Sequence, residues 1–269
     1  MAWKRWIVGS WSWKRPFLSL GFLYLSLLVV ACGFSDRFIF QPPPPSYQAE
    51  APNLVLLDDE KGKVAAFYYP PPEGGPVLLW SHGNAEDIGG PRLLHRDLAA
   101  HGLGLLAYDY PGYGLSEGRP SEKGCYRAAE LAWEFLATHK GIPPGNILVV
   151  GQSVGSGPAC YLAEKHHPAG LALISPLLSI YRVVMPVPLF PGDKFRNIER
   201  IPNIDCPLLV IHGPKDEVIG YRHGRKLYEL HDGPKRFVEI PEAGHNDLWS
   251  LGAEEMLDAL ARLARETRP

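Results

Sequence analysis

Residues 147–155 are ILVVGQSVG, an apolar run followed by a serine that has a glycine two positions to either side. An unbroken apolar run of this length predicts a strand buried on both faces, as in the middle of a parallel sheet. The glycines permit a tight turn from strand to helix, which would hold the Ser153 hydroxyl above the sheet. Because glycine-rich turns also occur without a catalytic role, the neighbouring segments decide what the pattern means.

Apolar runs and helical patterns alternate on both sides of Ser153. Short apolar runs predict strands at 77–80, 103–108, 171–174, 208–211 and 236–240, after a hairpin formed by 54–57 and 64–69. Helical patterns lie at 92–101, 122–139, 155–166, 221–230 and 253–266. This order predicts the α/β class: a mostly parallel central sheet with an N-terminal antiparallel hairpin and helices on both faces.

The composition bounds the kind of protein. With 269 residues, 46% of them hydrophobic, the chain can form one large domain, which we assign to residues 53–269. The formal net charge is −2, without a long basic run, so a nucleic acid is not expected as a partner. The cysteines form no CxxC pair, so neither a metal site nor a disulfide scaffold is predicted, and no cofactor is expected.

Residues 1–35 are predicted to be a signal segment or a membrane anchor. Residues 16–35 carry no charge and follow four basic residues, Lys4, Arg5, Lys14 and Arg15. A helix of this length reaches about 30 Å, the thickness of the hydrocarbon layer of a bilayer. The basic residues on the N-terminal side favour a position of the following domain on the non-cytoplasmic side of the membrane. The predicted localisation is a bacterial cell envelope.

Two interpretations of this segment stay open. Val29-Val30-Ala31-Cys32 resembles a lipoprotein signal, in which cleavage would leave Cys32 as the lipidated first residue. Alternatively, the segment is an uncleaved single-pass anchor. Residues 36–52 include four consecutive prolines and predict an extended spacer between the membrane and the domain.

An acid and a base follow two other predicted strands. Reacting groups of parallel sheets gather where the strands end, and a serine nucleophile needs a base that an acid orients. Asp216 follows the strand at 208–211, and His245 follows the last strand. Ser153, Asp216 and His245 are therefore the predicted catalytic triad, in the chain order that this type of fold uses. Glu217 and Asp247 are alternative carboxylates, but Asp216 has the expected position in its loop.

The turn after the strand at 77–80 is predicted to supply one of two oxyanion donors. Residues 81–84 are SHGN, and the backbone N–H of Asn84 would face the site. The second donor would be the N–H of Val154, next to the nucleophile at the start of a helix. His82 is expected to brace this turn rather than to act as a base. Asp109, in a glycine-rich loop, is expected to hold backbone donors.

These motifs form a set that resembles the α/β-hydrolase superfamily. The shared stretches are SHGNAED from Ser81, YDYPGYGLSEGRPSE from Tyr108, GQSVGSGP from Gly151, SPLLS from Ser175, VIHGPKDEVI from Val210 and AGHNDL from Ala243. The chain looks closest to the ABHD-type membrane-tethered serine hydrolases, which include protein depalmitoylases, and to their bacterial relatives. The resemblance covers roughly residues 54–249.

The resemblance implies the same residue roles as the motifs do. It implies Ser153 as nucleophile, Asp216 and His245 as its partners, and Asn84 and Val154 as oxyanion donors. The depalmitoylases of this family reach the membrane through clustered palmitoylated cysteines, whereas this chain has an apolar stretch with one cysteine, Cys32. The resemblance is therefore not taken to imply a palmitoylated protein as the substrate of this chain.

The predicted function is hydrolysis of an ester or thioester of a small-molecule or acylated substrate, through an acyl-enzyme and without a metal. Residues 175–206 are apolar and rich in proline, which predicts a short lid instead of a long helical one. Such a flap suits an acyl chain, although it also fits plain packing onto the sheet. Two alternatives are a serine peptidase of the same fold and a non-catalytic binding module of the envelope.

Overall fold

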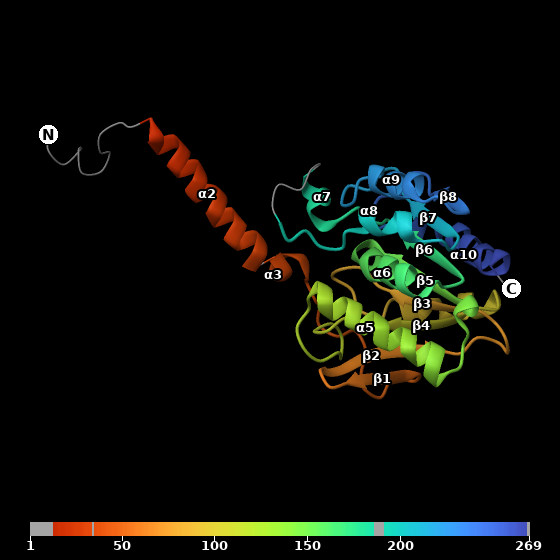
Figure 1. Cartoon of the computed structure of the whole chain (residues 1–269). Helices are drawn as coiled ribbons and strands as arrows, with labels where there is room; N and C mark the ends of the chain where they lie inside the picture. The colour runs from red at the N-terminus through yellow and green to blue at the C-terminus, as the bar shows by residue number, and fades with distance from the viewer. Residues whose placement is uncertain (1–12, 34, 186–190, 268–269) are drawn as a thin grey trace.

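The computed structural model describes residues 13–33, 35–185 and 191–267. An eight-stranded sheet crosses the domain in the order β1-β2-β4-β3-β5-β6-β7-β8 (Figure 1). The strands are β1 (Leu54–Asp59), β2 (Gly62–Tyr69), β3 (Val77–Ser81), β4 (Gly104–Tyr108), β5 (Ile147–Gln152), β6 (Gly170–Ile174), β7 (Leu208–His212) and β8 (Lys235–Glu239). The predicted α/β class is confirmed, and each strand lies within two residues of its predicted range.

The sheet is antiparallel only at its N-terminal edge among the described strands. β1 pairs with β2 as a hairpin, in which Leu57 is opposite Val64, and β2 pairs with β4 in the antiparallel sense. Each remaining pair, from β4 to β8, is parallel. Parallel neighbours need long crossovers, and these crossovers carry the helices. The carboxyl ends of β3, β5, β6 and β7 therefore meet at one edge of the sheet.

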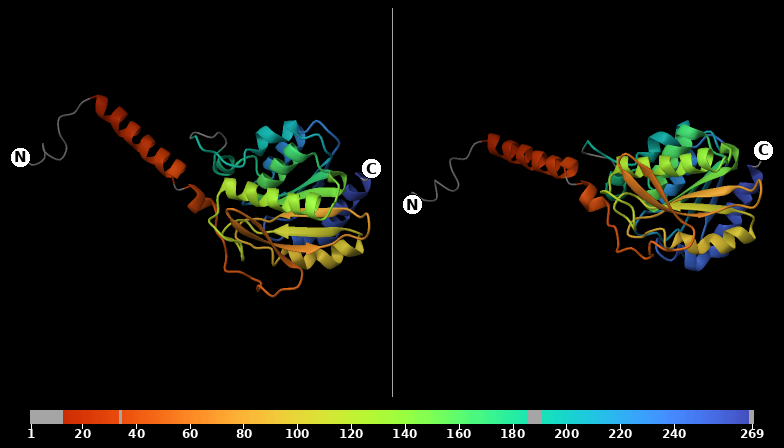
Figure 2. Two further views of the ribbon diagram at one scale, coloured as in Figure 1. Left: turned by 60° about the horizontal axis from the view of Figure 1, so that its bottom comes forward. Right: turned by 90° about the horizontal axis from the view of Figure 1, so that it is seen from below.

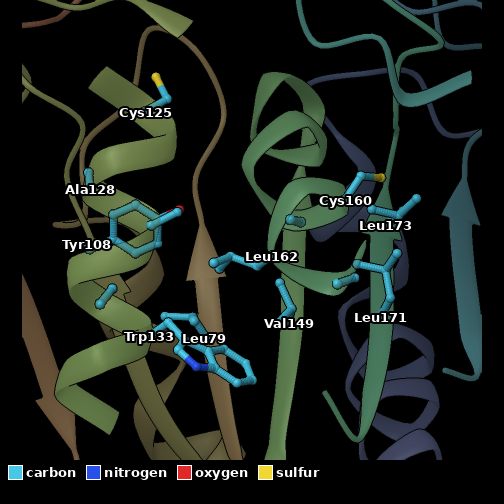
Figure 3. Close-up of a cluster of buried hydrophobic side chains, with 14 of the residues drawn as sticks. Leu79, Tyr108, Cys125, Ala128, Trp133, Val149, Cys160, Leu162, Leu171 and Leu173 are labelled. Atoms are coloured by element: carbon cyan, nitrogen blue, oxygen red, sulfur yellow. The ribbon is translucent and has the colours of Figure 1, made fainter. Parts of the chain in front are cut away.

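Helices cover both faces of the sheet, as predicted (Figures 1 and 2). One face is covered by α5 (Glu122–Glu134), α6 (Ser156–His166) and α9 (Arg222–Leu230), and the other by α4 (His95–Ala100) and α10 (Leu248–Glu266). Successive strand residues point to opposite faces, so that Leu79 and Val149 join one core and Leu78 and Leu148 the other. Figure 3 shows the first of these cores, between the strands and helices α5 and α6.

Shorter helical turns connect these elements. They are η1 (Pro91–Leu94), η2 (Phe135–His139, a π-helical turn), η3 (Pro144–Asn146), η4 (Ser153–Gly155), α7 (Ile180–Val184), α8 (Asn197–Arg200) and η5 (Ile201–Asn203). α10 begins at Leu248 rather than at the predicted residue 253. Gly252 departs from helical geometry there, and a Cβ at this position would lie 2.6 Å from Ile240 Cγ2, so the close packing requires glycine. Because of this kink, the turn before Gly252 does not continue the helical pattern of residues 253–266.

The N-terminal helix α2 (Lys14–Gly33) projects away from the domain and is followed by α3 (Ser35–Ile39) (Figure 1). α2 covers most of the predicted span, and its described side chains, such as Phe17 and Phe22, are largely exposed. In the described part of the chain, no helix combines the length and the apolar character needed to cross a membrane. The side chain of Cys32, the predicted lipidation site, lies outside what the structure describes.

The residues after α3 differ from a free spacer. Phe40 and Tyr47, at the two ends of the proline run, are only 4% and 6% exposed. The prolines keep the chain extended between them, while the two aromatic side chains bury against the domain. The predicted lid is described only in part, since residues 186–190 lie outside the described residues. Within the described part of residues 175–206, α7 is the longest helix, with five residues.

Candidate active site

Ser153 lies on a strained turn immediately after β5. Its φ is +53°, in the left-handed region that non-glycine residues rarely adopt. The two flanking glycines are required by close packing of the turn. A Cβ on Gly155 would lie 2.1 Å from the carbonyl oxygen of Ser81, and one on Gly151 would lie 2.5 Å from that of Gly155. The turn is therefore pressed against the end of β3, and Ser153 remains half-buried.

The structure brings the three predicted triad residues together from three strand ends. His245 Nε2 lies 3.1 Å from Ser153 Oγ, and His245 Nδ1 lies 2.8 Å from Asp216 Oδ2. Because a carboxylate only accepts hydrogen bonds, Nδ1–H donates to Asp216 and Nε2 can accept from the serine hydroxyl. In this arrangement the imidazole can take the serine proton. The catalytic roles of the three residues stay predictions.

Asp216 is a buried carboxylate with four hydrogen-bond donors. Oδ1 accepts the N–H groups of Val218 and Ile219, at 3.0 and 2.7 Å. Oδ2 accepts from His245 and also from His212 Nε2, at 3.1 Å. Burial would raise the pKa of Asp216, but the hydrogen bonds from the two histidines outweigh it and hold the pKa well below its ordinary value. Asp216 is therefore an anion at neutral pH.

His212, which contacts Asp216, was not predicted from the sequence. It is the last residue of β7 and is fully buried, and its Nε2 also lies 2.9 Å from the carbonyl oxygen of Ile219. Its place four residues before Asp216, at a strand end, was the only available signal. The alternative carboxylates have other positions: Asp247 accepts the N–H of Gly244 at 2.7 Å, and Glu217 is exposed.

One predicted oxyanion residue follows Ser153 in the chain, and the other belongs to a turn that approaches Ser153. Val154 follows it at the start of η4. Asn84 belongs to the turn after β3, and a Cβ on the adjacent Gly83 would lie 3.6 Å from Ser153 Cβ. The Asn84 side chain bonds elsewhere, since its Oδ1 accepts from Tyr113 Oη at 2.6 Å. The backbone N–H is thus the group by which Asn84 would act, and that role remains a prediction.

His82 braces this turn from below, as the sequence indicated. It is fully buried, its Nδ1 lies 2.7 Å from the Gly83 carbonyl oxygen, and its Nε2 lies 3.3 Å from Asp109 Oδ1. Burial favours the neutral ring, but the contact with Asp109 raises the pKa of His82 above its ordinary value. Asp109 Oδ1 also accepts the N–H of Ile88 at 3.1 Å. The pair therefore supports the loop.

An apolar cavity of about 370 Å³ adjoins Gln152, the residue before the predicted nucleophile. Its lining residues are Trp80, Glu86, Gly90, Pro91, Leu93, Leu94, Gln152, Trp249 and Ala253. Trp249 Nε1 donates to Gln152 Oε1 at 3.1 Å and fixes one wall. Burial raises the pKa of Glu86. This cavity could not be predicted from the sequence, because its walls come from four separate segments.

The described residues contain no group of three or more His, Cys, Asp and Glu side chains placed to hold a metal ion. Cys125, Cys160 and Cys206 are free, buried thiols. Burial raises the pKa of each of them, so they remain protonated at neutral pH.

Comparison with known proteins gives a consistent result. A family model described as alpha/beta hydrolase fold matches residues 76–198. The chain is 41% identical over 179 residues to alpha/beta hydrolase domain-containing protein 17B of Homo sapiens, covering 65% of this chain and 62% of that one. It is 42% identical over 180 residues to protein aho-3 of Caenorhabditis elegans, covering 64% and 53%. The matches thus span at most 62% of the length of these relatives.

Solved structures share the fold. The esterase Pf2001 of Pyrococcus furiosus superposes with a TM-score of 0.68, at 17% identity, over 86% of this chain and 98% of that one. Est1E of Butyrivibrio proteoclasticus, solved with ferulic acid bound, has a TM-score of 0.67 at 16% identity, over 79% and 98%. An alpha-beta hydrolase of Vibrio vulnificus has a TM-score of 0.59 at 25% identity, over 77% and 80%.

Proposed function

Since this chain belongs to the α/β-hydrolase superfamily, we propose that it is a serine hydrolase that cleaves an ester or thioester. The observation that carries the proposal is the unbroken row of contacts from Ser153 through His245 to Asp216. The strained turn at Ser153 adds support. A serine in the left-handed backbone region, between two tightly packed glycines, has the geometry of a nucleophile elbow.

In the proposed reaction, Ser153 Oγ attacks the carbonyl carbon of the substrate while His245 Nε2 accepts the hydroxyl proton. The ionised Asp216 stabilises the resulting imidazolium. The N–H groups of Asn84 and Val154 would donate to the oxyanion. His245 then returns the proton to the departing alcohol or thiol, leaving an acyl-serine. A water molecule, deprotonated by His245, attacks the acyl-serine, and the acid leaves as Ser153 is restored.

The cavity beside Gln152, the residue before the predicted nucleophile, supports the proposed substrate class. The apolar cavity beside Gln152 suits an aliphatic or aromatic group attached to the scissile bond. Two of the structural neighbours are named as an esterase and as a protein solved with ferulic acid. We therefore propose that the substrate is an ester or thioester of a small molecule or of an acylated compound. A palmitoylated protein is not proposed as the substrate.

The test is labelling of the full chain by a fluorophosphonate probe, compared with Ser153→Ala. Labelling that disappears in Ser153→Ala supports an activated Ser153, whereas a folded wild-type chain without labelling contradicts the proposal and favours the binding module. Panels of p-nitrophenyl esters, acyl thioesters and short peptides then separate esterase from peptidase. Hydrolysis of the peptides alone would favour the peptidase alternative.

We also propose that the N-terminal segment attaches the domain to a membrane and that the domain is exported. Support comes from the basic residues before the apolar stretch and from the exposed apolar side chains of the N-terminal region: Trp13, Phe17, Leu18, Leu20, Phe22, Leu23, Tyr24 and Leu25. The full chain should sediment with membranes, and a chain that starts at residue 36 should not. Protease accessibility of the domain in intact cells tests export, and Cys32→Ser tests lipidation.

A further inference from the structure

Residues 36–47, which begin within α3 and continue toward the sheet, will be called the strap. The strap lies against the end of the domain from which α2 projects (Figure 2). At its start, Asp36 pairs with Lys194, and Phe40 packs edge-on against Phe195 with ring centroids 6.1 Å apart. Phe195 in turn occupies the space beside Gly157 of α6, where a Cβ would lie 2.1 Å from its ring. The strap is therefore anchored beside the helix that follows Ser153.

In its middle, the strap binds the side chain of Asn84 from both sides. Asn84 Nδ2 donates to the carbonyl oxygen of Ile39 at 2.6 Å, and Oδ1 accepts the N–H of Gln41 at 3.1 Å. Tyr113 Oη donates to the same Oδ1 and also lies 3.1 Å from the Gln41 nitrogen. The carboxamide thus makes three hydrogen bonds, two of them to backbone groups of the strap.

At its end, the strap binds the continuation of the Asn84 turn and the separate loop that holds Asp109. The N–H of Ser46 donates to Asp87 Oδ2 at 2.6 Å, and a Cβ on Gly89 would lie 1.9 Å from Ser46 Oγ. The buried Tyr47 hydroxyl donates to Asp109 Oδ2. Asp109 is the same carboxylate that contacts His82 beneath the turn. The strap therefore contacts the turn itself and the carboxylate beneath it.

We propose that the strap is a positioning element of the active site and that it acts mainly through its hydrogen bonds to the Asn84 side chain. The inference rests on the proposed function. An oxyanion donor is effective only if its N–H is held in place before the reaction, so that no reorganisation is needed when charge develops. Residue 85 has a φ of +54°, so the turn is strained and needs outside contacts to keep its shape. The strap supplies such contacts, and it ties the site to the N-terminal helix.

The test uses the full chain and p-nitrophenyl butyrate, well below the unfolding temperature. Asn84→Ala removes the carboxamide but keeps the backbone N–H, and it should lower kcat about tenfold, short of the 10²–10³-fold cost of losing an oxyanion donor, with KM changed less than about twofold. Asn84→Asp keeps the acceptor for Gln41 and Tyr113, so its kcat should lie between that of the wild type and that of Asn84→Ala. Gln41→Ala is the matched control, since it removes an exposed side chain and keeps the bonding N–H.

A second variant keeps the test informative if Asn84→Ala does not fold. Tyr47→Phe removes one hydroxyl at the far end of the strap and should lower kcat severalfold, and combined with Asn84→Ala it should cost less than the product of the two effects. Wild-type kcat in folded Asn84→Ala and Tyr47→Phe, or an equal loss in Gln41→Ala, overturns the inference. A wild-type chain without Ser153-dependent fluorophosphonate labelling instead overturns the proposed function beneath it.

Discussion

His212 Nε2 lies 3.1 Å from Asp216 Oδ2, the same oxygen that lies 2.8 Å from His245 Nδ1. The predicted acid is thus held by two histidines, one of which faces Ser153 while the other is buried behind the site. The second histidine therefore holds the carboxylate independently of His245, the partner that would carry the proton.

The first prediction concerns this second histidine. His212→Leu leaves a buried carboxylate with one donor fewer, so the free energy of unfolding should fall by about 2 kcal/mol. The less firmly held carboxylate should lower kcat about tenfold, equivalent to about 1.4 kcal/mol of transition-state stabilisation. His212→Gln, which can place a donor near the former Nε2, is the control and should retain more of both. Equal kcat values in His212→Leu and the wild type would contradict this role.

Much of the fold could be predicted from the sequence, because the central strands are short, continuously apolar and buried on both faces. The positions of Ser153, Asp216 and His245 could likewise be predicted, since parallel strands that end at one sheet edge bring their following loops together. His212 was not predictable in the same way, because a histidine ending a buried strand has no pattern of its own. The docking of the strap against the domain could not be predicted either, because its contacts join residues more than 40 positions apart in the sequence.

A second prediction uses the strain at the nucleophile. Ser153→Gly and Ser153→Ala both remove the hydroxyl and should both abolish Ser153-dependent labelling. They differ in backbone cost, because glycine adopts a φ of +53° freely and alanine does not. Ser153→Gly should therefore unfold with a free energy about 1 kcal/mol higher than Ser153→Ala. Chemical denaturation of the two variants measures this difference, and a less stable Ser153→Gly would argue against strain at this turn.

A third prediction tests the tight packing behind the elbow. A Cβ on Gly155 would lie 2.1 Å from the carbonyl oxygen of Ser81, and backbone atoms at that distance must shift. Gly155→Ala should therefore destabilise the domain by about 3 kcal/mol or prevent folding. Gly145→Ala is the matched control, because a Cβ there meets no atom within 4 Å. Similar midpoints of thermal unfolding for the two variants would contradict the close approach of the elbow to β3.

The last prediction is a pH dependence of stability that originates at His223. This buried ring accepts the N–H of Leu178 at its Nδ1, at 3.1 Å, and burial lowers its pKa to about 4. Histidines in an unfolded chain have a pKa of about 6.5. Between pH 6.5 and pH 4, position 223 therefore binds a proton in the unfolded chain but not in the folded protein. Stability from His223 is thus fully present above pH 6.5 and declines as the pH falls toward 4.

The expected size of this decline is of the order of 2 kcal/mol. His223→Asn offers an amide oxygen in place of Nδ1 and has no proton to bind, so its free energy of unfolding should depend less on pH in this window. Urea denaturation of the wild type and of His223→Asn at pH 4.5, 5.5, 6.5 and 7.5 measures the two slopes. Parallel curves would mean that His223 takes up its proton in the folded state as readily as in the unfolded chain, and the neutral, accepting ring inferred from its contact with Leu178 would then be wrong.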